Sequence, residues 1–263
     1  MKKLPIEEVK SYWDHRIKDA RDSWEGVLWE GLPIWNTYID KLQMYHLRRY
    51  VRQIKRSDCI LDVGCGIGRF ALRFANICRE VWGIDTSATA IKICTDRNIL
   101  NAKFECMDVR RLDFGDATFD WVFSVTCLQH ITSEKDLAAS IGEVLRVTKN
   151  GGKIILVECT TDKRKDEYVI SLPRRKWFEI IENSGGKIQR WYGVDIPFLR
   201  RIVFLALGLT RKITNSGRIA RLFEYAAIIV LLPFEYAVPR ILKNQSWYTV
   251  LLISKQTDKS YKK

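Results

Sequence analysis

Residues 60–70, ILDVGCGIGRF, set an acid and closely spaced glycines directly after an apolar run. The acid is Asp62, and the glycines are Gly64, Gly66 and Gly68, with Cys65 between the first two. Such glycines let the backbone turn sharply and approach a ligand, and the helix that follows offers free N–H groups to it. The spacing is not the G-x-G-x-x-G of NAD-binding loops, because position 69 is arginine. No Lys-Ser/Thr pair follows, which excludes a P-loop.

Two further acids stand where later apolar segments end. Asp85 closes EVWGID (80–85), and Asp108 closes AKFECMD (102–108). A carboxylate at the first position can accept hydrogen bonds from both hydroxyls of a ribose, and one at the second can accept from an adenine amino group. Ligands of open α/β sheets bind beyond the carboxyl ends of the strands, so these acids and the glycine loop predict a nucleoside-binding site.

Alternating strands and helices position these residues. Short apolar segments predict strands at 59–63, 80–85, 102–108, 119–125, 151–158, 187–194 and 246–254. Intervening segments predict helices at 68–78, 86–98, 133–149 and 173–186. Before them, residues 5–55 read as two helices, the second starting near residue 36 after the break EGLPIWN. The alternation favours a doubly wound α/β sheet.

Taken in order, these motifs resemble those of the class I S-adenosylmethionine (SAM)-dependent methyltransferases, particularly the small-molecule enzymes of the type 11 group. The matching stretches are LDVGCGIGRF, WGIDTS, CMDVRRLDF, FDWVFSVTCLQHI and LRVTKNGGKIILVE. The resemblance covers about residues 55–195 and the last strand. It implies a Rossmann-like seven-stranded sheet whose last strand runs antiparallel, with SAM as the cofactor and S-adenosylhomocysteine as the product.

The resemblance also implies roles for individual residues. Those expected to bind SAM are Asp62, Gly64, Cys65, Gly66 and Gly68 at the methionine end, Asp85 and Thr86 at the ribose, Asp108 and Val109 around the adenine, and Thr126 near the sulfonium. From the N-terminal segment, Tyr12 would close over SAM and Arg16 would reach its carboxylate. No metal site is expected. Each strand-end aspartate could instead serve only as a helix cap.

Methyl transfer to a hydroxyl requires a base, because the nucleophile loses its proton during attack. His130, in the loop after the fourth strand, is the first candidate, and Glu158, at the end of the fifth strand, is the second. His130 could equally begin the next helix or hydrogen-bond within its loop.

The formal charge of +13 favours anionic partners. Neither a [DN]-P-P-[YF] motif nor a Pro-Cys pair supports a nucleic-acid substrate. The seven cysteines form no C-x-x-C pair, which is typical of reduced thiols in a cytosolic protein. The N-terminal MKKLPIEEVK lacks the apolar stretch of a secretory signal.

An insertion precedes the last strand. Residues 196–243 carry eight basic and two acidic residues, a net +6 of the chain's +13, together with the apolar runs RIVFLALGL and AAIIVLLPF. Neither run reaches the length of a membrane span. Apolar helices with basic flanks suit an anionic membrane surface, whereas a substrate lid or a homodimer face would account for them equally.

These observations divide the chain into an N-terminal helical cap (1–55), a SAM-binding core (56–195), a helical insertion (196–245) and a final strand with a polar tail (246–263). We expect methyl transfer to a small-molecule or lipid-linked acceptor, first as O-methylation of a sugar, glycan or amphipathic lipid. The alternatives are N- or C-methylation of another small molecule or quinone, and a SAM-binding sensor or complex subunit without catalysis. The expected location is the cytoplasm, at the inner membrane face if the insertion contacts lipid.

Overall fold

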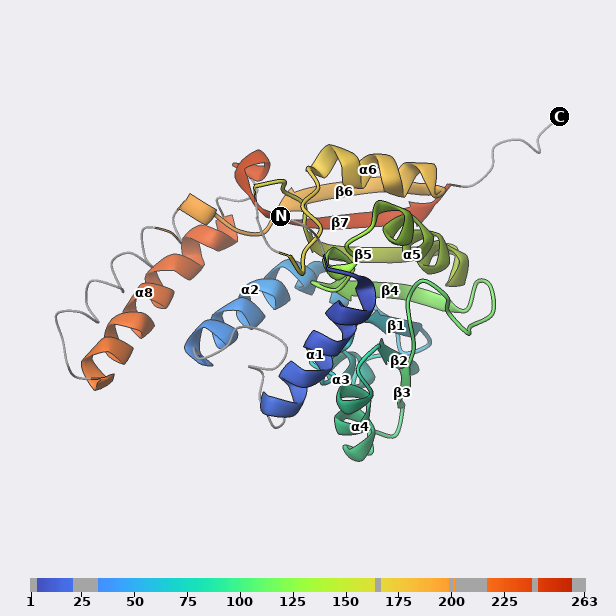
Figure 1. The fold of residues 1–263 in the computed structure, drawn as a ribbon, viewed down its shortest axis with the longest axis horizontal. Coiled ribbons are helices and arrows are strands. Elements are labelled where there is room, and N and C mark those ends of the chain that lie inside the picture. Colours follow the sequence, from blue (N-terminus) through green and yellow to red (C-terminus); the bar gives the residue numbers. More distant parts are fainter. Residues whose placement is uncertain are drawn as a thin grey trace.

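A computed structural model describes residues 4–20, 33–163, 167–198, 201, 217–237 and 241–256. Its centre is a seven-stranded sheet with the strand order β3-β2-β1-β4-β5-β7-β6 (Figure 1). The strands are β1 (Cys59–Val63), β2 (Glu80–Asp85), β3 (Ala102–Cys106), β4 (Phe119–Val125), β5 (Thr148–Cys159), β6 (Gly186–Gly193) and β7 (Tyr248–Lys255). The first five strands pair in parallel, whereas β7 runs antiparallel to both β5 and β6. The predicted fold class is confirmed.

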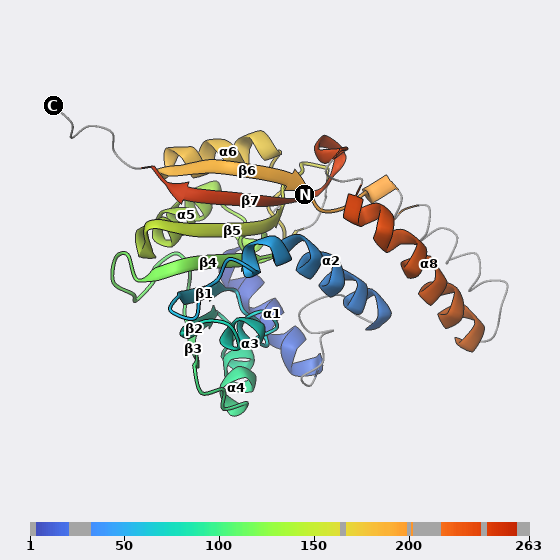
Figure 2. The same ribbon diagram turned by 180° about the vertical axis from the view of Figure 1, so that it is seen from behind.

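Helices lie on both faces of this sheet. They are α1 (Ile6–Ala20), α2 (Pro33–Val51), α3 (Ala71–Ala75), α4 (Ala88–Asp96), α5 (Glu134–Val147), α6 (Arg174–Asn183) and α8 (Gly217–Ala237), with the short 3-10 helices η2 (Leu128–His130) and η4 (Lys243–Gln245). Figures 1 and 2 show α5 and α6 together on one side of the strands and α2 on the other.

Successive residues of a strand point to opposite faces, and β1 shows the result. Ile60 packs in a core cluster with Leu42 of α2 and Phe74 of α3. Its neighbour Leu61 packs in a second cluster with Ile141 of α5. All five residues of β1 are buried, as expected for a central strand covered on both faces.

Several element boundaries differ from the sequence prediction, among them the starts of α2 and β5 and the end of β3. Helix α2 begins at Pro33, inside the segment expected to be a break, because proline is well suited to the first helical position. Strand β3 ends at Cys106, so Asp108 lies two residues beyond it. Strand β5 begins at Thr148 and runs through the glycine pair expected to open it.

Helix α8 is the described part of the insertion. It packs against α2 through the buried Leu231 and through Tyr236, whose ring stacks on Tyr45 at 3.8 Å. Glu235 is also buried and accepts a hydrogen bond from the Ile196 N–H at 3.0 Å. Figures 1 and 2 show it projecting from the body of the molecule on the side of α1 and α2. Among the helices of the described ranges, none is long and apolar enough to cross a membrane.

Candidate functional site

A cavity opens beyond the carboxyl ends of β1, β2 and β4. It has an empty volume of about 1070 Å³, its open mouth included. The glycine loop after β1, the residues after β3 and the loop after β4 form its floor and walls. Helix α1 covers it with Ile6, Val9, Lys10, Trp13 and Ile17, which share one helical face.

The glycine loop folds closely around this cavity. Gly64, Gly66 and Gly68 have φ values of +67°, +52° and +82°, which favour glycine over any residue with a side chain. A Cβ atom on Gly64 would lie 2.2 Å from the Sγ atom of Cys127. Cys65 donates its backbone N–H to the Ile84 carbonyl at 2.9 Å, which ties the loop to β2. The loop thus forms a cradle that only a bare backbone fits.

Asp62 serves the loop structurally. Its side chain is buried and accepts a hydrogen bond from the backbone N–H of Ala71 at 2.9 Å, at the start of α3. Burial raises the pKa of Asp62 to about 7. The carboxyl also borders the cavity, so the helix-cap role and the cavity position coexist in one residue.

Asp85 holds the second edge of the cavity. It accepts hydrogen bonds from the backbone N–H groups of Gly66 and Ser87, both at 2.9 Å, and burial raises its pKa. Both Asp85 and Thr86 line the cavity. A carboxylate that also fixes the glycine loop is well placed to accept from ribose hydroxyls, and this assignment stays a prediction.

Asp108 is already engaged by two cations. Arg110 donates to both of its oxygens, and Lys10 of α1 lies 2.9 Å away. Burial alone would raise the pKa of Asp108, but the hydrogen bonds from Arg110 and Lys10 hold it well below its usual range. Asp108 and the buried Val109 line the cavity. An adenine amino group would therefore share Asp108 with these cations.

The loop after β4 carries Thr126 and His130 to the cavity. Thr126 has φ +58°, a rare value for a β-branched residue. The Nδ1 atom of His130 lies 2.8 Å from the Tyr168 carbonyl. Because a carbonyl oxygen only accepts, Nδ1 carries the proton and Nε2 keeps a lone pair. The side-chain amide of Gln129 donates from its Nε2 atom to this Nε2 atom of His130 at 3.3 Å.

Glu158, the second base candidate, lies behind this loop and not among the cavity residues. It is fully buried and accepts a hydrogen bond from Ser124 Oγ at 2.7 Å. It also accepts from the backbone N–H groups of Cys127, Leu128 and Gln129. The structure therefore does not support Glu158 as the base, and gives it the role of fixing the loop that carries His130.

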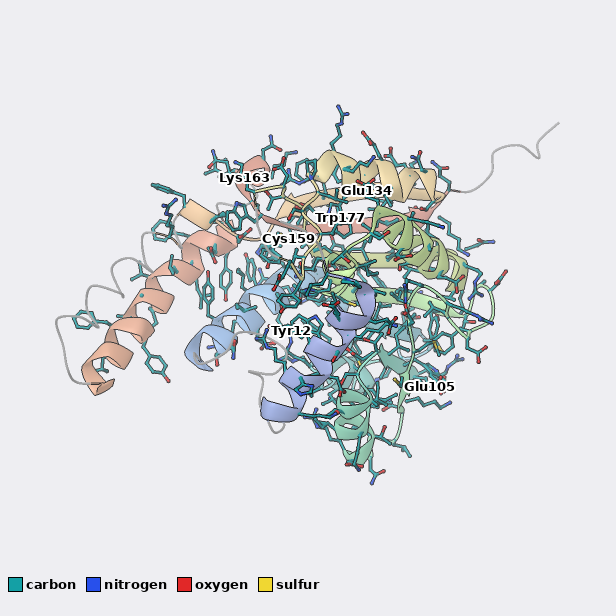
Figure 3. All side chains as sticks on the ribbon, viewed as in Figure 1. Tyr12, Glu105, Glu134, Cys159, Lys163 and Trp177 are labelled. Atoms are coloured by element: carbon teal, nitrogen blue, oxygen red, sulfur yellow. The ribbon has the colours of Figure 1, made fainter. Side chains whose placement is uncertain are left out.

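Tyr12 and Arg16, predicted to contact SAM, lie outside the described cavity lining, and their roles stay predictions. Tyr12 of α1 (Figure 3) stacks on Tyr168 with ring centroids 4.0 Å apart, and Arg16 donates to the Tyr12 hydroxyl. The described cavity lining includes neither residue. It includes Trp13, which lies one residue further around the helix.

Arg69 is a cavity residue that sequence reasoning used only to exclude NAD. Arg69 borders the cavity, and its guanidinium lies 3.0 Å from Asp40 of α2 and over the Phe70 ring. Burial lowers the pKa of Arg69 to about 10, while Asp40 opposes the shift. A guanidinium stays charged at that pKa, so Arg69 is a further candidate for the contact with the SAM carboxylate that the sequence assigned to Arg16.

The residues present fit SAM. The glycine cradle admits close backbone approach, acids stand at the ribose and adenine positions, and Arg69 supplies a cation at the methionine end. In addition, the Nε1 atom of Trp13 is buried without a hydrogen-bond partner among the described residues, and Trp13 lines the cavity. Within the same described ranges, no cluster of three or more His, Cys, Asp or Glu residues could hold a metal ion.

Helix α1 is fixed over the cavity by Asp14 as well as by Lys10. Asp14 accepts from Ser87 Oγ at 2.6 Å and from the Thr89 N–H at 3.2 Å, at the start of α4. Partial burial alone would raise the pKa of Asp14, but hydrogen bonds from Lys18, Ser87 and Thr89 hold it well below its usual value. The carboxylate is therefore ionised at neutral pH, and the link is lost only on acidification.

We expect Asp14→Ala to raise the Kd for SAM about fivefold, because it removes hydrogen bonds that hold α1 across the cavity. Isothermal titration calorimetry measures the change. Glu8→Ala, at an exposed position of the same helix, is the control and should leave the Kd unchanged. Equal affinity in both variants would show that α1 does not contribute to SAM binding.

Known proteins resemble this chain in sequence and in fold. Residues 60–152 match the family described as "Methyltransferase domain". An uncharacterized protein of Methanocaldococcus jannaschii, MJ0638, is 27% identical over 249 residues, covering 91% of this chain and 99% of its own. A ubiquinone biosynthesis O-methyltransferase of Rhodopseudomonas palustris is 29% identical over 133 residues, covering 48% of this chain and 50% of its own.

Among solved structures, the [4+2]-cyclase SpnF superposes with a TM-score of 0.65 at 22% identity, covering 97% of this chain and 98% of the SpnF chain. The fold is that of the class I SAM-dependent methyltransferases. With its methyltransferase domain at residues 60–152, the chain is a SAM-dependent methyltransferase, and SAM is its cofactor. It spans about half the length of the R. palustris relative, so its acceptor is a matter for proposal.

Proposed function

We propose that the chain methylates a hydroxyl of a small-molecule or lipid-linked acceptor, with His130 as the general base. The observation that carries this proposal is the fixed tautomer of His130 beside the cavity. Its Nδ1 proton is held by the Tyr168 carbonyl at 2.8 Å, which leaves Nε2 as the basic nitrogen. The O-methyltransferase name of the R. palustris relative supports an oxygen acceptor.

SAM would supply an electrophilic methyl group on a positively charged sulfur. The chain's own residues supply position and proton transfer. The glycine cradle, Asp85 and Arg69 would hold the cofactor, while Nε2 of His130 would take the proton of the acceptor hydroxyl. The edge of Trp13 packs against the His130 ring with centroids 4.7 Å apart, which keeps the imidazole in place.

Neighbouring thiols do not compete for this role. Burial raises the pKa of Cys127 well above its usual value, so its sulfur stays protonated and weakly nucleophilic.

The described cysteines are all free thiols, which supports a cytoplasmic location. Within the cytoplasm, we propose that the chain lies at the inner face of the membrane. We favour a sugar, glycan or amphipathic lipid as the acceptor, and N- or C-methylation of another small molecule or a quinone is the alternative.

The direct test incubates the protein with methyl-labelled SAM and an extract of the producing cells, then separates lipid, aqueous and nucleic-acid fractions. Label in the lipid or glycolipid fraction supports a lipid-linked acceptor, and label in the aqueous fraction supports a soluble one. Label in nucleic acid would overturn the proposal. SAM binding without any transfer would favour a sensor or complex subunit.

We expect His130→Gln to lower kcat by about 10² to 10⁴, with a Kd for SAM close to that of the wild type. The acidic limb of the pH–rate profile should also disappear, because the titrating base is gone. His15→Gln, at an exposed position of α1, is the matched control. An unchanged kcat in His130→Gln would show that another group, or water, receives the proton.

A further inference from the structure

The outer face of α8 exposes large apolar side chains. Those between 49% and 69% exposed are Leu222, Phe223, Tyr225, Ile229, Val230 and Phe234. Their spacings of three, four and seven residues place them on one side of the helix. Leu231 and Glu235, which are both buried, mark the opposite side. We call these six residues the outer face of α8.

This face is unusual for a protein surface. Single exposed apolar residues are ordinary, but contiguous apolar patches mark sites of interaction with proteins or membranes. None of the six described residues of the outer face is charged, and Ile241 and Leu242, which follow α8, are also exposed and apolar. A partner with apolar chemistry therefore fits it.

Charge favours one such partner over another. The segment 196–243 carries eight basic against two acidic residues, a net +6, and one of the two acids, Glu235, is buried. Two copies of the chain that met through this segment would bring like charges together. An anionic lipid surface would attract the same charges.

We propose that the outer face of α8 docks on the surface of an anionic lipid bilayer. Its apolar side chains enter the boundary between headgroups and acyl chains, and the net positive charge of segment 196–243 favours an anionic lipid surface. This inference rests on the proposed function, because docking on a bilayer would bring a lipid-linked acceptor to the enzyme. Figures 1 and 2 show α8 beside α2, at the same end of the sheet as α1, which covers the cavity.

Vesicle flotation of the full chain tests the proposal. Vesicles of phosphatidylcholine alone are compared with vesicles that also contain phosphatidylglycerol, at low and at high salt. We expect binding to the anionic vesicles, weakened by salt because screening reduces the attraction. The double variant Ile229→Asp/Val230→Asp should lower the bound fraction at least about tenfold, because two exposed aliphatic side chains no longer enter lipid.

Leu100→Asp is the matched control. Leu100 is fully exposed in the turn between α4 and β3, on another part of the molecule, so its replacement should leave vesicle binding unchanged. If the wild type stays in the aqueous fraction, or if Leu100→Asp lowers binding as much as the α8 variant does, the proposal is wrong. It is also overturned if the wild type is a dimer by light scattering and the α8 variant a monomer.

Failure of this inference and failure of the proposed function give different results. The α8 residues lie outside the cavity lining, so the double variant should bind SAM with wild-type affinity by calorimetry. Vesicle binding without methyl transfer to any acceptor would leave the docking face intact and refute the proposed function. Methyl transfer without vesicle binding would refute the docking face alone.

Discussion

Replacing Gly64 with alanine should raise the Kd for SAM at least about a hundredfold. Gly64 has φ +67°, and a Cβ atom there would lie 2.2 Å from Cys127 Sγ and 2.4 Å from Cys127 Cβ. The left-handed backbone costs a residue with a side chain roughly 1–2 kcal/mol. The overlap further forces the glycine loop and the loop after β4 apart. Calorimetry with SAM measures the loss.

Gly151→Ala separates strain from overlap. Gly151 also has a positive φ, +80°, but a Cβ atom there would meet nothing within 4 Å. This control should lose about 1 kcal/mol of stability and keep its SAM affinity. The double variant Gly64→Ala/Cys127→Gly removes the overlapping atoms and should recover part of the affinity. Wild-type affinity in Gly64→Ala alone would contradict the assignment of the cradle.

Glu158→Ala should cause the largest loss of stability. The buried carboxyl accepts from three consecutive backbone N–H groups, of Cys127, Leu128 and Gln129, and from Ser124 Oγ. An unsatisfied buried donor costs about 1–3 kcal/mol, so we expect the Tm to fall by about 10 °C. In the surviving folded protein, kcat should also fall, because the loop that carries His130 loses its anchor. Scanning calorimetry and single-turnover assays measure the two effects.

Glu105→Ala is the control for this variant. Glu105 lies exposed on β3 (Figure 3), at one end of the strand order, and its removal should change the Tm by less than about 1 °C. Equal Tm values for the Glu158 and Glu105 variants would show that the buried carboxyl does not hold the loop.

The pH dependence of stability provides a second readout for Glu158. Burial raises its pKa from 4.5 to about 7, against the opposing hydrogen bonds. A carboxyl with a raised folded pKa binds its proton more tightly in the folded state. Its contribution to stability is therefore present below pH 4.5 and is lost as the pH rises through about 7. Glu158→Gln should remove this part of the pH dependence, measured as the difference between its unfolding curves and those of the wild type.

The sequence predicted what depends on local pattern. Apolar strands, the glycine spacing and the acids at strand ends are all visible in the chain. Together they predicted the sheet and a nucleoside-binding site, whereas SAM itself was implied by the resemblance to a known family. Asp85 is an example, because its position at the end of β2 places it at the carboxyl edge of the sheet, where the cavity lies. The antiparallel direction of β7 came from the resemblance to a known family and is confirmed by its pairing with β5.

What the sequence did not predict depends on tertiary packing. Trp13 and Tyr12 are adjacent on α1, and only the rotation of the helix against α4 decides which of them borders the cavity. Glu158 lies in a strand that is buried on both faces, so alternation could not show whether its carboxyl faces the cavity or the back of a loop. The role of Arg69 depends on Asp40, which lies on a helix distant in sequence.

Thr126 has an energetic consequence for the site. A threonine with φ +58° is less stable than glycine would be in the same conformation, at a cost of roughly 1–3 kcal/mol. Its N–H bond to the Val157 carbonyl keeps it there. The fold therefore bears this cost once, during folding, and the loop is already ordered when a ligand arrives. Such preorganisation strengthens binding at the expense of thermal stability. A glycine at position 126 would therefore raise the thermal stability and weaken the binding of the ligand.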